Sequence, residues 1–217
     1  MTKKVYLLDA NVLIDYYIDQ CPSVIQFVDK IKTEREAGKC LIYVPNICIA
    51  EVFSVFSRTY FYKQEGKKED EYREKKWSFI NDISRDYKYK RFQHFTHLEL
   101  NRYHMIHAHL VYQPAFEYLK LAHKKGIHVK DGKQQFPSAI DLLVIAQGIE
   151  MTGLYSDEEF SLVTADRLIS SLCEHLCGLS NTDRKIFLKG RNASEEDLKN
   201  LSAYRYPKCV NAKTIQR

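Results

Sequence analysis

The stretch VYLLDANVLIDYY, residues 5–17, places Asp9 directly between two apolar runs. Residues 5–8 are short, apolar and rich in strand-favouring side chains, and a second apolar stretch follows the acid. This pattern predicts a buried strand that leads into a helix. A carboxylate buried at such a junction is costly unless another group compensates its charge.

The same strand-and-helix alternation recurs further along the chain. Residues 23–37 carry apolar side chains at helical spacing, between Pro22 and Gly38. A second strand is expected at 40–44, closed by Pro45, and Asn46 can cap the helix that follows. After residue 135 we expect a helix beginning near Ser138, a strand within 160–166, a helix over 167–179 and a last strand near 203–212.

Between these parts, residues 57–135 have a different character. Charged and aromatic residues alternate in long stretches compatible with helices, and no buried strand is evident. We therefore predict a single domain, 1–217, with a mostly helical insertion at about 57–135. Strands that alternate with helices predict the α/β class, with a mostly parallel central sheet flanked by helices.

The composition is that of a globular protein of 217 residues, with 45% hydrophobic and 28% charged residues. The formal net charge of +5 suits a polyanionic partner but does not by itself indicate one. Six scattered cysteines fit reduced thiols in the cytoplasm. We find neither a targeting signal nor an apolar run long enough to span a membrane.

Four acids stand at the predicted strand ends or in the first turns of the following helices: Asp9, Glu51, Asp141 and Asp166. Taken singly, Asp9 and Asp166 can be explained as helix N-caps, and Asp141 fits a Ser-x-x-Asp capping pattern with Ser138. Glu51 is harder to explain in this way, because its helical neighbours are apolar. Ligands bind parallel sheets at the carboxyl ends of the strands, so we expect the four acids to converge.

Converging carboxylates repel one another unless cations lie between them. Ligands that are all oxygen atoms favour Mg²⁺ or Mn²⁺ over zinc. Such a site can polarise a phosphoryl group and activate water for in-line attack, which is the chemistry of nucleases and phosphatases.

The segments LLDANVLID, NICIAEVFSVF, AIDLLVIAQ and LVTADRLI resemble, in this order, the four acidic motifs of the PIN-domain family of metal-dependent ribonucleases. That family includes the VapC-type toxins of toxin–antitoxin pairs. The resemblance covers roughly residues 3–60 and 136–178, and the insertion between the second and third motifs is enlarged. It implies a three-layer sandwich and endoribonuclease activity on RNA, with Mg²⁺ or Mn²⁺ as cofactor.

Carried over by position, Asp9, Glu51, Asp141 and Asp166 would be the catalytic metal ligands. Asn11 and Thr164 match polar positions that support the site in the family. The resemblance also implies an RNA substrate, a small antitoxin as partner and a homodimer.

Outside these motifs, the stretch RDYKYKRF, residues 85–92, interleaves cations with aromatic rings. Lys88, Lys90 and Arg91 are candidate RNA contacts, since cations bind phosphates while aromatic rings stack on bases. The alternative, which we favour, is an amphipathic surface segment. Five histidines between residues 94 and 109 could in principle bind metal, but histidines on a helical surface are the simpler explanation.

Two other functions are compatible with the acids. A haloacid-dehalogenase-like phosphatase also begins with an acid after its first strand, but it needs a second Asp where this chain has Asn11. A nucleic-acid- or protein-binding module of PIN-like fold without catalysis would use the acids only as caps and salt-bridge partners. This module predicts no effect of divalent cations on stability or RNA cleavage.

Overall fold

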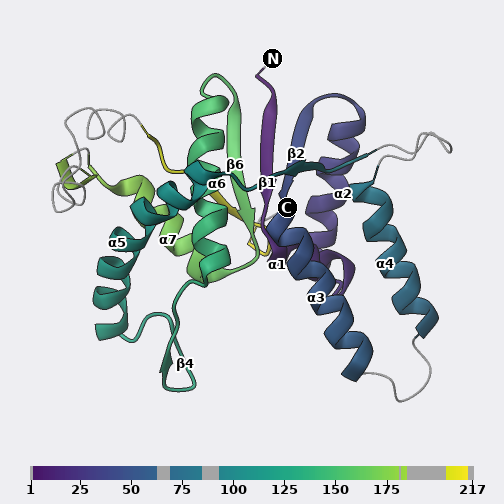
Figure 1. The fold of residues 1–217 in the computed structure, drawn as a ribbon, viewed down its shortest axis with the longest axis horizontal. Helices are drawn as coiled ribbons and strands as arrows, with labels where there is room; N and C mark the ends of the chain where they lie inside the picture. Colours follow the sequence, from purple (N-terminus) through teal and green to yellow (C-terminus); the bar gives the residue numbers. More distant parts are fainter. Residues whose placement is uncertain (1, 63–68, 85–92, 181, 185–203, 215–217) are drawn as a thin grey trace. The chain divides into compact units, whose positions relative to one another are not determined.

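The computed structural model describes residues 2–62, 69–84, 93–180, 182–184 and 204–214 (Figure 1). The chain forms two compact units. The first unit comprises Met1–Leu100, Val163–Ala165 and Val210–Arg217, and the second comprises Asn101–Leu162 and Asp166–Cys209. The expected insertion at 57–135 therefore contributes residues to both units.

The protein has the predicted α/β fold, with a mostly parallel sheet flanked by helices. Five strands form this sheet in the order β3-β2-β1-β6-β7. β1 pairs in parallel with β2, and β2 pairs in parallel with β3. The strands are β1 (Lys4–Leu8), β2 (Cys40–Pro45), β3 (Thr96–Leu98), β6 (Glu159–Thr164) and β7 (Cys209–Asn211).

The helices of the first unit are α1 (Ala10–Tyr17), α2 (Pro22–Glu36), α3 (Asn46–Tyr62) and α4 (Glu69–Ile83). Two of them lie where the sequence predicts them: α2 coincides with the helix expected at 23–37, and α3 begins at Asn46. Pro22 opens α2, and Gly38 follows the end of that helix with a φ of +72°, which glycine adopts without strain. Tyr6 of β1 packs edge-on against Phe27 of α2, with 5.9 Å between ring centroids, so α2 covers this strand.

Helix α4 belongs to the core of the first unit, although it falls in the expected insertion. Phe79 of α4 is fully buried. Its ring lies 5.1 Å from that of Tyr17 and 5.3 Å from that of Phe53, measured between centroids. Aromatic packing therefore fastens α4 to α1 and α3.

The predicted insertion also contains a short strand of the central sheet, which was not predicted from the sequence. β3 pairs with the end of β2, from Tyr43 opposite Thr96 to Pro45 opposite Leu98. With three residues and partly exposed side chains, β3 has no apolar alternation that would mark it in the sequence.

The second unit contains α5 (Arg102–Lys124), α6 (Ala139–Leu154), α7 (Arg167–Gly178) and a small hairpin of β4 (Val129–Lys130) and β5 (Lys133–Gln134). Val111, Ala115, Leu119 and Ala122 form the buried stripe of α5 at helical spacing. None of the described helices combines the length and the apolar character that crossing a bilayer requires.

Candidate active site

Asp9 occupies the carboxyl end of β1 and is only 2% exposed. Its backbone N–H donates to the carbonyl of Val163 at 2.9 Å, which fixes the end of β1 beside β6. The side chain caps α1, where Oδ1 accepts from the N–H of Ala10 at 2.7 Å. The capping explanation of Asp9 is therefore confirmed, and it accounts for one of the two carboxylate oxygens.

The other oxygen of Asp9 accepts from the two residues predicted to support it. Thr164 Oγ1 donates to Asp9 Oδ2 at 2.8 Å, and Asn11 Nδ2 donates to the same oxygen at 3.2 Å. Thr164 is fully buried at the end of β6 and belongs to the first unit with Asp9. Both donors are neutral, so they orient the carboxylate without cancelling its charge.

Glu51 lies in α3, also in the first unit, one turn after the end of β2. It is half-buried beside Cys48 and Val52, which are fully buried. Its neighbours on this helix are thus buried and apolar, as expected, while its role as a ligand stays a prediction.

Asp141 and Asp166 both belong to the second unit. Asp141 forms a reciprocal capping box with Ser138, in which Asp141 Oδ2 accepts from the Ser138 N–H at 2.6 Å. Asp166 caps α7 and accepts from the N–H of Leu168 at 2.6 Å. As for Asp9, the capping explanations of these acids are confirmed.

The pKa of Asp141 is raised above its ordinary value. Burial is the main cause, hydrogen bonds from Ser138 oppose it, and the negative charge of Asp166 adds to it. The charge of Asp166 thus disfavours the ionised form of Asp141, and a cation near both acids would relieve this effect.

The structure brings Asn11 and Thr164 to the carboxylate of Asp9. Within the described residues of either unit, no group of three or more His, Cys, Asp or Glu side chains stands ready to hold a metal ion. The convergence of all four acids stays a prediction. Lys88, Lys90 and Arg91, the candidate RNA contacts, lie outside the described residues.

Two of the clustered histidines have structural partners in the second unit. His104 is 1% exposed, pairs with the carboxylate of Glu150 and completes the capping box of α5 with Asn101. His107 is also buried, and its ring packs edge-on against Tyr204, with 4.7 Å between centroids. Burial lowers the pKa of both imidazoles, which favours their neutral forms.

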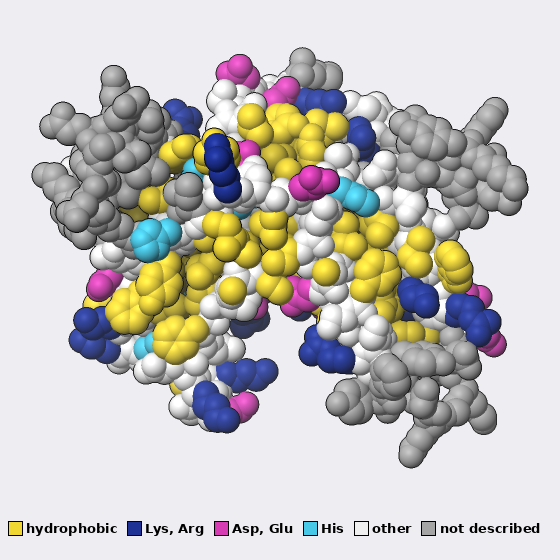
Figure 2. Space-filling model, in the orientation of Figure 1, with side chains coloured by type: hydrophobic (Ala, Val, Ile, Leu, Met, Phe, Trp, Pro, Cys, Tyr) yellow, Lys and Arg dark blue, Asp and Glu magenta, His cyan; other side chains and the backbone are white. Residues whose placement is uncertain are grey.

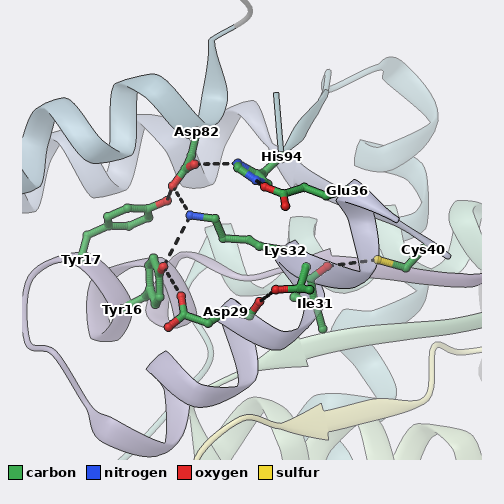
Figure 3. A network of polar contacts seen from close by, with 10 residues as sticks. Tyr16, Tyr17, Asp29, Ile31, Lys32, Glu36, Cys40, Asp82 and His94 are labelled. Atoms are coloured by element: carbon green, nitrogen blue, oxygen red, sulfur yellow. Dashed lines mark hydrogen bonds and ion pairs between the residues drawn. The ribbon is translucent and has the colours of Figure 1, made fainter. Parts of the chain in front are cut away.

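A polar network in the first unit was not anticipated from the sequence (Figure 3). Asp82 of α4 is its centre: the carboxylate accepts from Lys32 Nζ at 2.7 Å, from the hydroxyl of Tyr17 and from His94 Nδ1 at 2.8 Å. His94 Nε2 in turn contacts Glu36 Oε1 at 2.7 Å. The network ties α4 and the segment before β3 to α1 and α2.

The titration of this network follows from its geometry. The hydrogen bond to Asp82 raises the pKa of His94, burial opposes this, and Glu36 adds to it, with a net rise. Burial alone would raise the pKa of Asp82, but hydrogen bonds from His94, Lys32 and Tyr17 outweigh it and lower the pKa. The position of His94 between two carboxylates therefore raises its pKa and favours its charged form.

The fold and the oriented acids define an α/β protein with carboxylates at strand ends. No protein-family model matches the chain, and no curated protein matches it. Among solved structures, the chain is similar to one described as VapBC2 from Rickettsia felis bound to a DNA fragment from their promoter. The TM-score is 0.42 and the sequence identity 14%, over 77% of this chain and 92% of that chain.

Proposed function

We propose that this protein is a metal-dependent endoribonuclease of PIN-domain type that hydrolyses RNA phosphodiester bonds. The observation that carries the proposal is the buried carboxylate of Asp9, oriented by Thr164 and Asn11 at the end of a parallel strand. Hydrogen-bond donors that fix the orientation of a carboxylate are typical of the shell around metal ligands. The repulsion between Asp141 and Asp166 adds a second place where a cation would be stabilising.

The donor set fits Mg²⁺ or Mn²⁺, since all four candidate ligands are carboxylates. Asp9, Glu51, Asp141 and Asp166 would hold the ion. When bound, such an ion supplies Lewis-acid polarisation of the phosphoryl group and a more acidic water. Thr164 and Asn11 keep the Asp9 carboxylate in one orientation, and the capping bonds of Asp141 and Asp166 limit the rotation of those side chains.

The test is cleavage of a labelled RNA pool in Mn²⁺, in Mg²⁺ and in EDTA, with wild type beside Asp9→Asn. We expect cation-dependent cutting that falls roughly a hundredfold or more in the variant, because metal-assisted catalysis contributes several kcal/mol. The matched control is Asp70→Asn, the same change at an acid of α4 whose side chain is 94% exposed. Equal cleavage by wild type and Asp9→Asn would refute the assignment.

The rival function is a binding module of the same fold without catalysis. The capping bonds of Asp9, Asp141 and Asp166 favour it, since capping alone gives these acids a structural purpose. Thermal denaturation separates the two functions. A metal site predicts that Mg²⁺ or Mn²⁺ raises the melting temperature by mass action, and that Asp9→Asn reduces the rise, whereas the binding module predicts no shift.

We extend the proposal to a toxin-like protein with a small antitoxin as partner. Such a partner would present an Arg to the acids, because guanidinium and carboxylate groups form paired hydrogen bonds. Inhibition of cleavage by the product of a neighbouring short reading frame is the expected result. Undiminished cleavage with that product bound in excess would contradict this part of the proposal.

A further inference from the structure

The second unit contains a pocket of about 330 Å³, lined by residues from the C-terminal part of α5, the β4–β5 hairpin and the segment that follows it. Its volume lies at the lower end of the range for small-ligand sites. The residues that line it are Phe116, Lys120, His123, Lys124, Gln134 and Phe136.

The wall formed by the hairpin is held in place by hydrogen bonds. His123 Nε2 donates to the carbonyl of Gln135 at 3.0 Å, and the Gln135 N–H donates to the carbonyl of His128 at 2.8 Å. The His123 ring meets that of Phe136 edge-on, with 5.1 Å between centroids. These hydrogen bonds and the ring contact with His123 hold Phe136 beside α5.

Two of the lining side chains are large aromatic rings open to solvent. Phe116 is 46% exposed and Phe136 is 56% exposed. Tyr112, 55% exposed, stacks on Phe116 with 6.5 Å between centroids and extends the aromatic surface along α5. Exposed rings gathered at a pocket mark a surface that a ligand can cover.

The charge beside these rings is positive. Lys120 and Lys124 line the pocket, and Lys130 and Lys133 are exposed on the hairpin. Figure 2 shows hydrophobic side chains over α5 and Lys or Arg side chains at the hairpin. Glu117 and Asp131 are the nearby acids in sequence, so the lysines outnumber them. Aromatic rings next to lysines suit a ligand with planar bases and phosphates.

Phe136 also lies two residues before Ser138, the N-cap of α6, which carries the candidate ligand Asp141. We propose that this pocket binds an unpaired nucleotide of a single-stranded RNA, with the base against Phe116 and Phe136 and the adjacent phosphates against Lys120 and Lys124. The inference rests on the proposed function, since it names how the substrate of that site is held.

The test measures binding without catalysis. A fluorescein-labelled oligouridylate of about ten nucleotides is titrated in EDTA, and its anisotropy gives Kd. Phe136→Ala and Phe116→Ala should weaken binding roughly fivefold to 150-fold, the range for loss of one base–aromatic stack. Phe136→Leu, which keeps an apolar side chain without an aromatic face, should also weaken it. Trp77→Ala, at a 54% exposed ring of the first unit, is the matched control.

The lysines are tested through the salt dependence of the same binding. Lys124→Ala should reduce the slope of log Kd against log salt by about 0.7, the value for one phosphate contact of a single strand. Kd values unchanged in both Phe variants would overturn the inference. Displacement of the RNA by oligoglutamate at equal concentration would also overturn it, because this result would indicate an acidic peptide as the ligand. Loss of cleavage in Asp9→Asn with unchanged RNA binding would leave both proposals standing. Metal-independent binding without any cleavage would refute only the nuclease.

Discussion

Replacement of Asp82 by Ala should destabilise the first unit more than any exposed substitution on the same helix. The Asp82 side chain is 9% exposed, and those of Lys32 and His94 are 18% and 13% exposed. Removing the carboxylate deprives the largely buried Lys32 and His94 of this acceptor and removes the bond from Tyr17. Breaking a buried ion pair by deleting one partner costs about 3–5 kcal/mol, and the partial exposure of Lys32 favours the lower end.

The assay is urea unfolding at pH 7, followed by far-ultraviolet circular dichroism and by the fluorescence of Trp77, the single tryptophan, which lies on α4. The control is Asp70→Ala on the same helix, whose 94% exposed carboxylate lies 3.7 Å from Arg73. Exposed pairs contribute about 0–1 kcal/mol, so this variant should resemble wild type. Equal losses in the two variants would refute the reasoning.

The pH dependence of stability gives an independent check on the same network. Because folding raises the pKa of His94 above its ordinary 6.5, its contribution is complete below that value and is lost as the pH rises through the folded-state pKa. The lowered pKa of Asp82 gives a contribution that is present above 3.8 and lost as the pH falls through the folded-state value. His94→Gln should remove the alkaline decline; a decline of the same size in this variant would show that another group causes it.

Other predictions concern single contacts in each unit. Thr164→Val removes the hydroxyl that bonds to Asp9 and should lower the rate of RNA cleavage roughly 10- to 100-fold. Thr164→Ser keeps a hydroxyl and should keep the wild-type rate. Equal cleavage rates for the Val and Ser variants would exclude a positioning role for Thr164. Gly148→Ala should destabilise the second unit by roughly 1–3 kcal/mol in thermal denaturation, because the new Cβ would lie 2.8 Å from Cγ of Pro207. In Gly153→Ala, on the same helix, the new Cβ meets open space, and the variant should be more stable than wild type by about 0.5–1 kcal/mol. Changes in stability of the same sign in the two variants would contradict this reasoning.

The parts of the fold predicted from the sequence are those with a strong local pattern. β1 is an apolar run ended by Asp9, and Ser138 with Asp141 forms the capping box that its spacing indicated. The β4–β5 hairpin was not predicted, although the Asp131-Gly132 pair is typical of two-residue hairpin turns. In the structure both residues have the positive φ that such a turn requires.

Long-range contacts left no such signal. Lys32 and Asp82 are 50 positions apart in the chain, and neither has neighbours that indicate an ion pair. The pocket likewise depends on how the hairpin folds back toward α5, so Phe116 and Phe136 were not singled out. Thr164 and Asn11 were identified through the resemblance, and the structure gives them a physical role as donors to Asp9.

The division of β6 between the two units has a consequence for folding during synthesis. The chain passes between the units after Leu100, Leu162, Ala165 and Cys209, so neither unit is a continuous segment. The first unit includes Val163–Ala165 and a segment that begins at Val210, and both are made after residues 101–162 of the second unit. Thr164 therefore reaches Asp9 only after more than 150 further residues have been made. Truncation at Leu100 would yield an N-terminal fragment that contains Asp9 and Asn11 but lacks the Thr164 hydroxyl, which donates to the Asp9 carboxylate in the whole chain.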